Sequence, residues 1–288
     1  MRGRCGRHAC LRVGRWPPTW PFMPRPILFV LAAPFALALP VAARAVTPPP
    51  TAHATLFLDA YAVGLRVMRM RAELDFTAAG YAVQTDYRTT GLAGALVSSH
   101  QITAVNGYWR PTGVAPRLFH GAGDWNGSPT RMLIDFAGAT PDVHVLLPRN
   151  DPDHDLIPPD VTRGTEDTLS PMAQLTRQIV QTGRCDGQAA TYDGRRVVRI
   201  TVRTIGMETL PATGRSSFSG PALRCDFTGW QVAGFRHDAG PAAHRPKYGS
   251  AWFAPLAPGG PPLPVRVSFG TPWVGHVTLY VTAPPGPG

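Results

Sequence analysis

Apolar and polar residues alternate along most of the chain after residue 55, which is the pattern of β-strands with one buried face. The alternation is clear in 81–87, and in 198–203 valine and isoleucine occupy one face while arginine and threonine occupy the other. The other candidate strands are 56–67, 68–76, 96–105, 118–125, 131–136, 143–147, 223–227, 265–269 and 277–281.

Two dipeptides between these strands favour tight hairpin turns, Asn126-Gly127 and Asp193-Gly194. Short strands with turn signals about every ten residues are typical of antiparallel sheets, sandwiches and barrels. We therefore predict a mainly β fold, a strongly curved antiparallel sheet or incomplete barrel, with one packed helix near residues 171–182.

The helix prediction rests on start and stop signals around that segment. Ser170 is a suitable N-cap, Pro171 follows at the first helical position, and Gly183 ends the pattern. Glu166 and Asp167 place negative charge near the expected N-terminus, where the helix dipole favours it. We expect this helix to pack on the sheet or to plug one end of a barrel.

The first 45 residues follow a different pattern, which is typical of a secretory signal peptide. A basic lead without acidic residues precedes the apolar run 27–39, and small residues at Ala43 and Ala45 form a cleavage signal. The apolar run is thirteen residues long, whereas a transmembrane helix needs roughly 17–25. We expect export across the inner membrane, a periplasmic location and no transmembrane segment after cleavage. Met23 offers an alternative start that would shorten the leader.

Removing the leader changes the charge balance and leaves one domain. Seven of the 28 basic residues lie in 1–45, so the remaining chain has 21 basic against 18 acidic residues and a net charge of +3 instead of +10. The remaining arginines are scattered, and we therefore predict no nucleic-acid partner. We expect a Pro-rich linker at 46–54, a single β-rich domain at 55–282 and a Pro/Gly tail at 283–288.

Two cysteines remain after cleavage, Cys185 and Cys225. An even number of cysteines in an oxidising compartment favours a disulfide. A reactive thiol or a metal pair is the alternative, but the sequence has no CxxC motif and no histidine at ligand spacing. We predict a Cys185–Cys225 disulfide.

The remaining polar motifs predict no catalytic residue, metal site or cofactor. Residues 151–155 begin like a calcium loop, but Leu156 and Thr162 stand where such a loop needs glycine and glutamate. The histidines form neither HxxxH nor HExxH, and the chain lacks a nucleophile elbow, a P-loop and a dinucleotide-binding glycine motif. The serines at 216, 217 and 219 fit a polar turn.

Several segments of the chain resemble one family of exported bacterial proteins, the domain-of-unknown-function family numbered 3108. The segments are Tyr61–Leu65, Asp167–Pro171, Gly183–Cys185, Tyr192–Arg196, Ser219–Cys225, Val232–Phe235 and Leu263–Arg266. The resemblance implies a secreted or periplasmic β-rich protein without an assigned activity or assigned catalytic residues. Relatives carry cysteine at both positions, which adds support to the disulfide.

Three hypotheses for function follow. The first is a non-enzymatic binder or carrier of an apolar, lipid-like molecule inside the curved sheet. Aromatic residues near the strands could line such a cavity or simply fill the core: Phe57, Phe76, Trp109, Trp125, Phe136, Phe227, Trp230, Trp252, Phe269 and Trp273. The second is an envelope structural or assembly factor that binds protein partners through exposed strand edges. The third is a hydrolase with an unrecognised His/Asp arrangement, which requires both groups within hydrogen-bond reach in a pocket.

Overall fold

The computed structural model describes residues 51–149, 154–271 and 275–284. The expected signal peptide, most of the 151–155 acidic cluster and Trp273 lie outside these ranges. Within these ranges thirteen strands form one antiparallel sheet. They are β1 (Ala52–Ala62), β2 (Leu65–Phe76), β3 (Gly80–Thr89), β4 (Ser99–Trp109), β5 (Val114–Trp125), β6 (Ser128–Asp135), β7 (Asp142–Leu147), β8 (Gly187–Tyr192), β9 (Val197–Leu210), β10 (Gly220–Ala233), β11 (Lys247–Pro255), β12 (Pro262–Thr271) and β13 (Gly275–Thr282).

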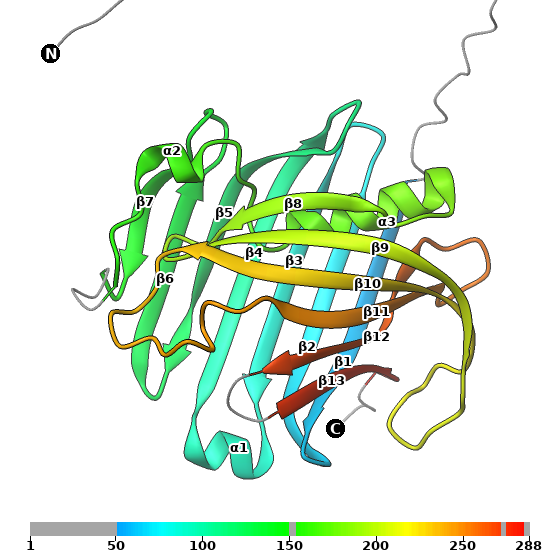
Figure 1. The fold of residues 1–288 in the computed structure, drawn as a ribbon. Coiled ribbons are helices and arrows are strands. Elements are labelled where there is room, and N and C mark those ends of the chain that lie inside the picture. Colours follow the sequence, from blue (N-terminus) through cyan, green and yellow to red (C-terminus); the bar gives the residue numbers. More distant parts are fainter. Residues whose placement is uncertain (1–50, 150–153, 272–274, 285–288) are drawn as a thin grey trace, which may run out of the picture. The chain divides into compact units, whose positions relative to one another are not determined.

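The sheet order explains why the barrel is incomplete. The strands run β7-β6-β5-β4-β3-β2-β1-β13-β12-β11-β10-β9-β8, so β1 lies at the centre and pairs with both β2 and β13. The edge strands β7 and β8 do not pair with each other. The two halves of the sheet curve around so that β8–β13 cross over β1–β7 (Figure 1). The structure thus confirms the predicted curved antiparallel sheet and leaves it open.

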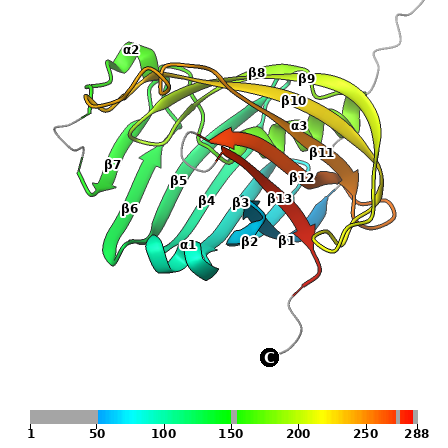
Figure 2. The ribbon, with the colours of Figure 1, turned by 60° about the horizontal axis from the view of Figure 1, so that its bottom comes forward.

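Helix α3 (Ser170–Thr182) lies in the long connection between β7 and β8, together with the short α2 (Pro159–Thr162). It contacts β3, β5 and β12, and it lies between the two halves of the sheet (Figures 1 and 2). We call the face of the sheet turned toward α3 the inner face. The predicted helix at 171–182 is therefore confirmed within one residue, and it ends at Gly183 in a left-handed conformation, as expected.

The predicted turns also appear, with one addition. Asn126 and Gly127 both have positive φ and join β5 to β6, which is the geometry of a type I′ hairpin. The same pair of positive φ angles occurs at Val63 and Gly64. The apolar stretch 56–67 therefore contains the end of β1, a turn and the start of β2. The sequence did not predict this turn, because the positive φ of Val63 is rare for a β-branched residue.

The sequence predictions missed the strands β8 and β11, and several predicted boundaries differ from those of the structure, two of them at the start of a strand. The strand expected at 96–105 begins later, because α1 (Gly91–Leu96) occupies the start of that stretch and β4 begins at Ser99. Strand β1 begins at Ala52, inside the range expected to be a linker. In the second case the alternation of apolar residues is too short before residue 56 to identify the strand, and pairing with β2 defines it.

Candidate functional site

An apolar cavity of about 490 Å³ lies between the inner face of the sheet and the start of α3. This volume falls within the roughly 300–1,000 Å³ that is typical of small-molecule sites. Its lining is mostly aliphatic, with methionines and two phenylalanines. The apolar lining residues are Leu56, Leu58, Met70, Ala72, Leu74, Val83, Phe119, Met132, Leu169, Met172, Pro264, Val267, Phe269 and Leu279.

The alternation of the strands produces this wall. Leu56 and Leu58 on β1 face the cavity, and Leu58 pairs with Met70 on β2 and with Val281 on β13. Neighbouring strands in register place their apolar positions on the same face of the sheet. Residues from β1 to β6 and from β12 and β13 therefore contribute to one continuous apolar surface.

Two threonines lie within the apolar wall, but they satisfy each other. Thr85 on β3 and Thr103 on β4 stand opposite each other, and their hydroxyl oxygens are 2.7 Å apart in a hydrogen bond. Because each hydroxyl already has a hydrogen-bond partner, neither requires a polar group of a ligand as an additional partner. This part of the wall therefore offers mainly methyl groups to an occupant.

Asp193 and Arg196 in the cavity lining are ion-paired, and the Arg196 charge acts on Tyr87. Together with Thr168, which also lines the cavity, we call these residues the mouth. Thr168 is exposed and the Arg196 side chain is 56% exposed, so the cavity reaches solvent here. Arg196 donates through Nε and Nη2 to Asp193 Oδ2, at 3.2 and 3.0 Å. Burial raises the pKa of Tyr87, and the nearby Arg196 charge partly offsets this.

Asp193 fixes the backbone that carries the mouth. Its Oδ1 accepts hydrogen bonds from the backbone N–H groups of Arg195 and Arg196, at 2.9 and 2.7 Å. These bonds hold the β8–β9 hairpin in a defined turn, which is the local use of aspartate that the Asp193-Gly194 signal predicts. The same hairpin reaches β7, because Arg195 donates to the carbonyl of Pro148.

The start of α3 is anchored by a buried polar cluster next to the mouth. Asp167 Oδ1 accepts from the N–H groups of Leu169 and Ser170 at 2.7 and 3.0 Å, and Asp167 Oδ2 accepts from the Ser170 hydroxyl. The Ser170 hydroxyl is also 2.5 Å from the Tyr81 hydroxyl on β3. The sequence prediction that Ser170 caps α3 is therefore wrong, because Asp167 supplies the acceptor while Ser170 connects the helix to the sheet.

Burial changes the acidity of this cluster. It raises the pKa of Asp167, against the lowering effect of the hydrogen bonds from Ser170 and Leu169, and it raises the pKa of Tyr81. It also raises the pKa of Glu166 to about 8, with a further contribution from the neighbouring Asp167. Glu166 lies at the edge of the sheet, where its backbone forms a parallel bridge with Thr191 of β8.

The free energy of unfolding is expected to fall as pH rises from 5 to 8, with Glu166 as a main cause. Its folded pKa of about 8 lies above the ordinary value of 4.5. The folded state therefore keeps a proton that the unfolded state has lost, and the stabilisation present below pH 4.5 disappears as pH passes through 8. Urea unfolding at several pH values should show a loss on the order of 2 kcal/mol.

Glu166→Gln keeps the shape of the side chain without the ionisation, so its unfolding free energy should depend less on pH than that of the wild type. Glu73→Gln, on the outer face, is the matched control and should keep the wild-type slope. Equal slopes for wild type and Glu166→Gln would contradict the assignment.

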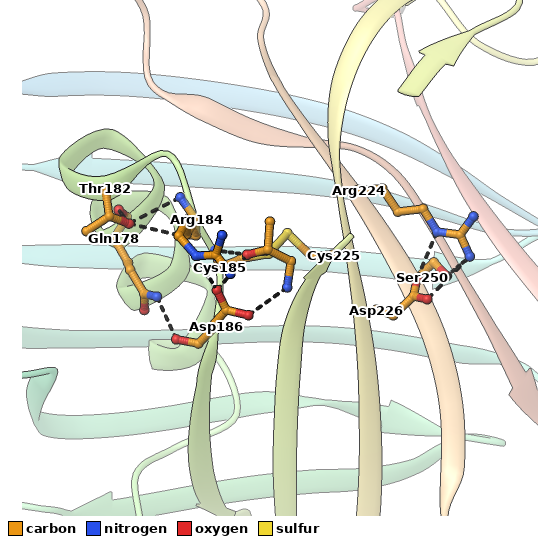
Figure 3. The surroundings of a disulfide bond; sticks show 10 residues. Gln178, Thr182, Arg184, Cys185, Asp186, Arg224, Cys225, Asp226 and Ser250 are labelled. Carbon is orange, nitrogen blue, oxygen red and sulfur yellow. Dashed lines mark hydrogen bonds and ion pairs between the residues drawn. A yellow bond between two sulfur atoms is a disulfide. The ribbon is translucent and has the colours of Figure 1, made fainter. Parts of the chain in front are cut away.

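The predicted disulfide is present, and it joins the end of α3 to β10. Cys185 and Cys225 are bonded and fully buried, with Cα atoms 6.2 Å apart (Figure 3). Around them Asp186 accepts from the backbone N–H and hydroxyl of Thr204, both at 2.9 Å, and from Arg184 Nε at 2.8 Å. These bonds lower the pKa of Asp186. Gln178 of α3 donates to the Asp186 carbonyl at 2.6 Å, which ties the helix to the same point (Figure 3).

Most of the aromatic residues singled out in the sequence do not line the cavity. Of the members of that set that the structure describes, Phe269 alone does, and Phe119, which the sequence reasoning missed, also lines it. Trp125 and Trp230 are about half exposed. Trp252 is buried elsewhere, where its indole N–H donates to Glu208 at 2.8 Å. Burial of Phe119 follows from its position on the inner face of β5, a signal already present in the alternation of 118–125.

Trp109 has a structural role beside the buried cluster. Its ring centroid lies 5.0 Å from that of Tyr81, and the guanidinium of Arg177 lies 4.9 Å from the Trp109 ring centroid. Arg177 also donates to the carbonyl of Arg110 at 2.9 Å. These contacts fasten α3 to the β4–β5 hairpin, so Trp109 positions the helix and not a ligand.

The histidine and carboxylate pairs lie at the surface. His53 Nδ1 is 2.6 Å from Asp75 Oδ1, and His100 Nε2 is 2.9 Å from Asp86 Oδ1, with all four side chains 44–63% exposed. Within the described ranges no serine, threonine or cysteine is hydrogen-bonded to a histidine of these pairs. Both pairs are therefore partly exposed and have, among the described residues, no hydroxyl or thiol nucleophile in hydrogen-bond contact with the histidine. Nor does any group of three or more His, Cys, Asp or Glu there form a metal-binding cluster.

None of the helices in the described part of the chain has the length and apolar character needed to cross a bilayer.

A comparison with known protein families shows which family the chain belongs to. The family described as "Protein of unknown function (DUF3108)" matches residues 58–282. The chain belongs to the DUF3108 family. The match confirms the resemblance read from the sequence, and it covers the DUF3108 sheet from β1 to the end of β13.

A comparison with solved structures finds a match to this DUF3108 chain. It is the crystal structure of a β-barrel-like protein of domain of unknown function DUF1849 from Brucella abortus. The two are 13% identical, with a TM-score of 0.45, and the similarity covers 81% of this chain and 96% of that one. No curated protein matches the DUF3108 chain.

Proposed function

We propose that this protein is an exported, non-enzymatic carrier or binder of an apolar, lipid-like molecule in the bacterial cell envelope. The observation that carries the proposal is the cavity of about 490 Å³ with an aliphatic wall and a polar mouth. The secretory leader read from the sequence supports a periplasmic location.

Physical chemistry favours hydrocarbon over water in this space. Water in an apolar cavity lacks the two to four polar partners that it needs. Each methylene moved from water into such a wall contributes about 0.8 kcal/mol. Three lining methionines, Met70, Met132 and Met172, have flexible side chains that can adapt to occupants of different shape.

Binding of a neutral apolar probe tests the proposal. Purified protein should bind N-phenyl-1-naphthylamine with an increase in probe fluorescence. Ala72→Phe places a ring in the cavity and should weaken this binding about tenfold, because the added volume displaces the probe. Ala104→Phe is the matched control, because Ala104 lies on the opposite face and lines a separate pocket of about 260 Å³. It should bind the probe like the wild type.

Absence of probe binding to folded wild-type protein would overturn the proposal, as would equal binding by both variants. If Ala72→Phe fails to fold, Ala72→Leu provides a smaller step with the same expected direction. Native mass spectrometry of protein taken from the periplasm provides an independent readout. We expect an adduct with the mass of a lipid. We also expect the polypeptide mass to match a chain that begins directly after Ala45.

A further inference from the structure

The mouth of the cavity differs chemically from its wall, and this difference bears on the kind of ligand. The wall is mainly apolar and its Thr85 and Thr103 are paired with each other, whereas the mouth consists of Tyr87, Thr168, Asp193 and Arg196. Asp193 and Arg196 are the two residues with ordinarily charged side chains among those that line the cavity. An apolar chamber with polar groups gathered at its entrance suits a molecule with one apolar and one polar end.

Arg196 has hydrogen-bonding capacity left for a ligand. Its Nε and one Nη2 proton are directed at Asp193, but a guanidinium carries five N–H donors. No residue in the described ranges accepts a hydrogen bond from Arg196 Nη1. The side chain is also 56% exposed, so a group that enters from solvent can reach it.

Asp193 does not exclude an anion from the mouth. Its carboxylate already accepts four hydrogen bonds, two from backbone N–H groups and two from the Arg196 guanidinium. Arg195 adds a second positive charge on the same turn, which leaves the turn 193–196 with one net positive charge. Glu166 stands near Thr168 in the chain, and its raised pKa of about 8 keeps it largely neutral below that pH.

We propose that the ligand is a single-chain amphiphile with an anionic head group, such as a fatty acid, whose carboxylate binds Arg196 at the mouth while its chain fills the cavity. This inference rests on the proposed function, because it names the class of molecule for the same cavity. A guanidinium and a carboxylate form strong charge-assisted hydrogen bonds with matching geometry. The Tyr87 hydroxyl and Thr168 provide further polar groups beside the head group.

Paired ligands that differ only at the head group test the inference. The affinities of laurate and 1-dodecanol are measured for the wild type by displacement of N-phenyl-1-naphthylamine. We expect laurate to bind about tenfold more tightly than dodecanol, the size of one charge-assisted hydrogen bond. Arg196→Gln should remove this preference by weakening laurate about tenfold while leaving dodecanol unchanged. Arg196→Lys should restore part of it.

Two further variants separate head-group recognition from a general change in charge. Arg199→Gln removes the same charge from an exposed position that does not line the cavity, and it should keep the wild-type preference. The double variant Asp193→Asn, Arg196→Gln leaves neither charged partner at the mouth. It should still bind dodecanol and should show no preference for laurate.

The possible results distinguish this inference from the proposed function. Equal affinity of the wild type for laurate and dodecanol, or an unchanged laurate preference in Arg196→Gln, would overturn the head-group assignment while apolar binding stands. Absence of binding for the probe and both ligands would overturn both.

Discussion

Removal of the Cys185–Cys225 disulfide is expected to lower the free energy of unfolding by about 4 kcal/mol, because the bond closes a loop with a separation of 40 residues. Without it, the unfolded chain gains the conformational freedom of that loop. Both cysteines are fully buried in a cluster with Ile179 and Phe253, so the folded state also loses packing. The double variant Cys185→Ala, Cys225→Ala should melt about 10 °C below the oxidised wild type.

Urea unfolding of three samples measures this effect: oxidised wild type, wild type reduced with dithiothreitol, and the double variant. The free energy of unfolding of the reduced protein should be close to that of the double variant, because both lack the same covalent constraint. A loss below about 1 kcal/mol in both would contradict the loop-closure argument. Since the bond joins the end of α3 to β10, we expect the region of α3 to gain the most hydrogen exchange in the variant.

The second large effect is expected at Asp167. Asp167→Ala should lower the free energy of unfolding by about 3 kcal/mol, because it removes the acceptor for one part-buried and two buried donors. These donors are the N–H groups of Leu169 and Ser170 and the Ser170 hydroxyl. Asp167 and Ser170 are both fully buried, so water cannot replace the lost partner without a local opening of the fold.

Two further variants serve as comparisons for Asp167→Ala in the same urea titration. Tyr81→Phe removes one hydroxyl from the cluster, which should cost about 1 kcal/mol. Asp142→Ala removes a carboxylate that is 75% exposed at the edge of the sheet, and it should change stability by less than about 0.5 kcal/mol. If Asp167→Ala changes the free energy of unfolding as little as Asp142→Ala does, the buried cluster does not anchor the start of α3.

The same cluster links stability to the proposed binding site. Thr168 and Leu169 line the cavity, and Asp167 and Ser170 flank them in the chain. The residues that anchor the start of α3 therefore also position two lining residues of the cavity, Thr168 and Leu169. A ligand that binds only the folded state should raise the melting temperature of Asp167→Ala as it does that of the wild type.

Much of the fold was predictable because it follows from local signals. Alternation along strands such as 81–87 identifies residues that share a face, and Asn126-Gly127 restricts the turn between β5 and β6. The start and stop signals of α3 act within one or two turns of the helix. The two cysteines that follow the predicted leader have one intramolecular pairing available, so the disulfide was predictable without coordinates.

The candidate site was not predictable, because it depends on contacts between distant segments. Period-two alternation shows which residues of a strand share a face, but it does not show which face turns inward. Trp252 illustrates the difference. It shares a face with Arg224 and Arg266, whose guanidinium groups lie 5.5 and 4.7 Å from its ring centroid, and it therefore does not line the cavity.

By itself the sequence determined that this protein is a mostly β, disulfide-bonded member of its family with one helix between its seventh and eighth strands. Only the tertiary structure decided that Ser170 of that helix contacts Tyr81 of β3. It also decided that Tyr87, Thr168 and Arg196 line the same cavity. These three residues come from three separate segments of the chain. The curvature of the sheet and the return of the β8–β9 hairpin bring them together, and no local pattern encodes a contact of that range.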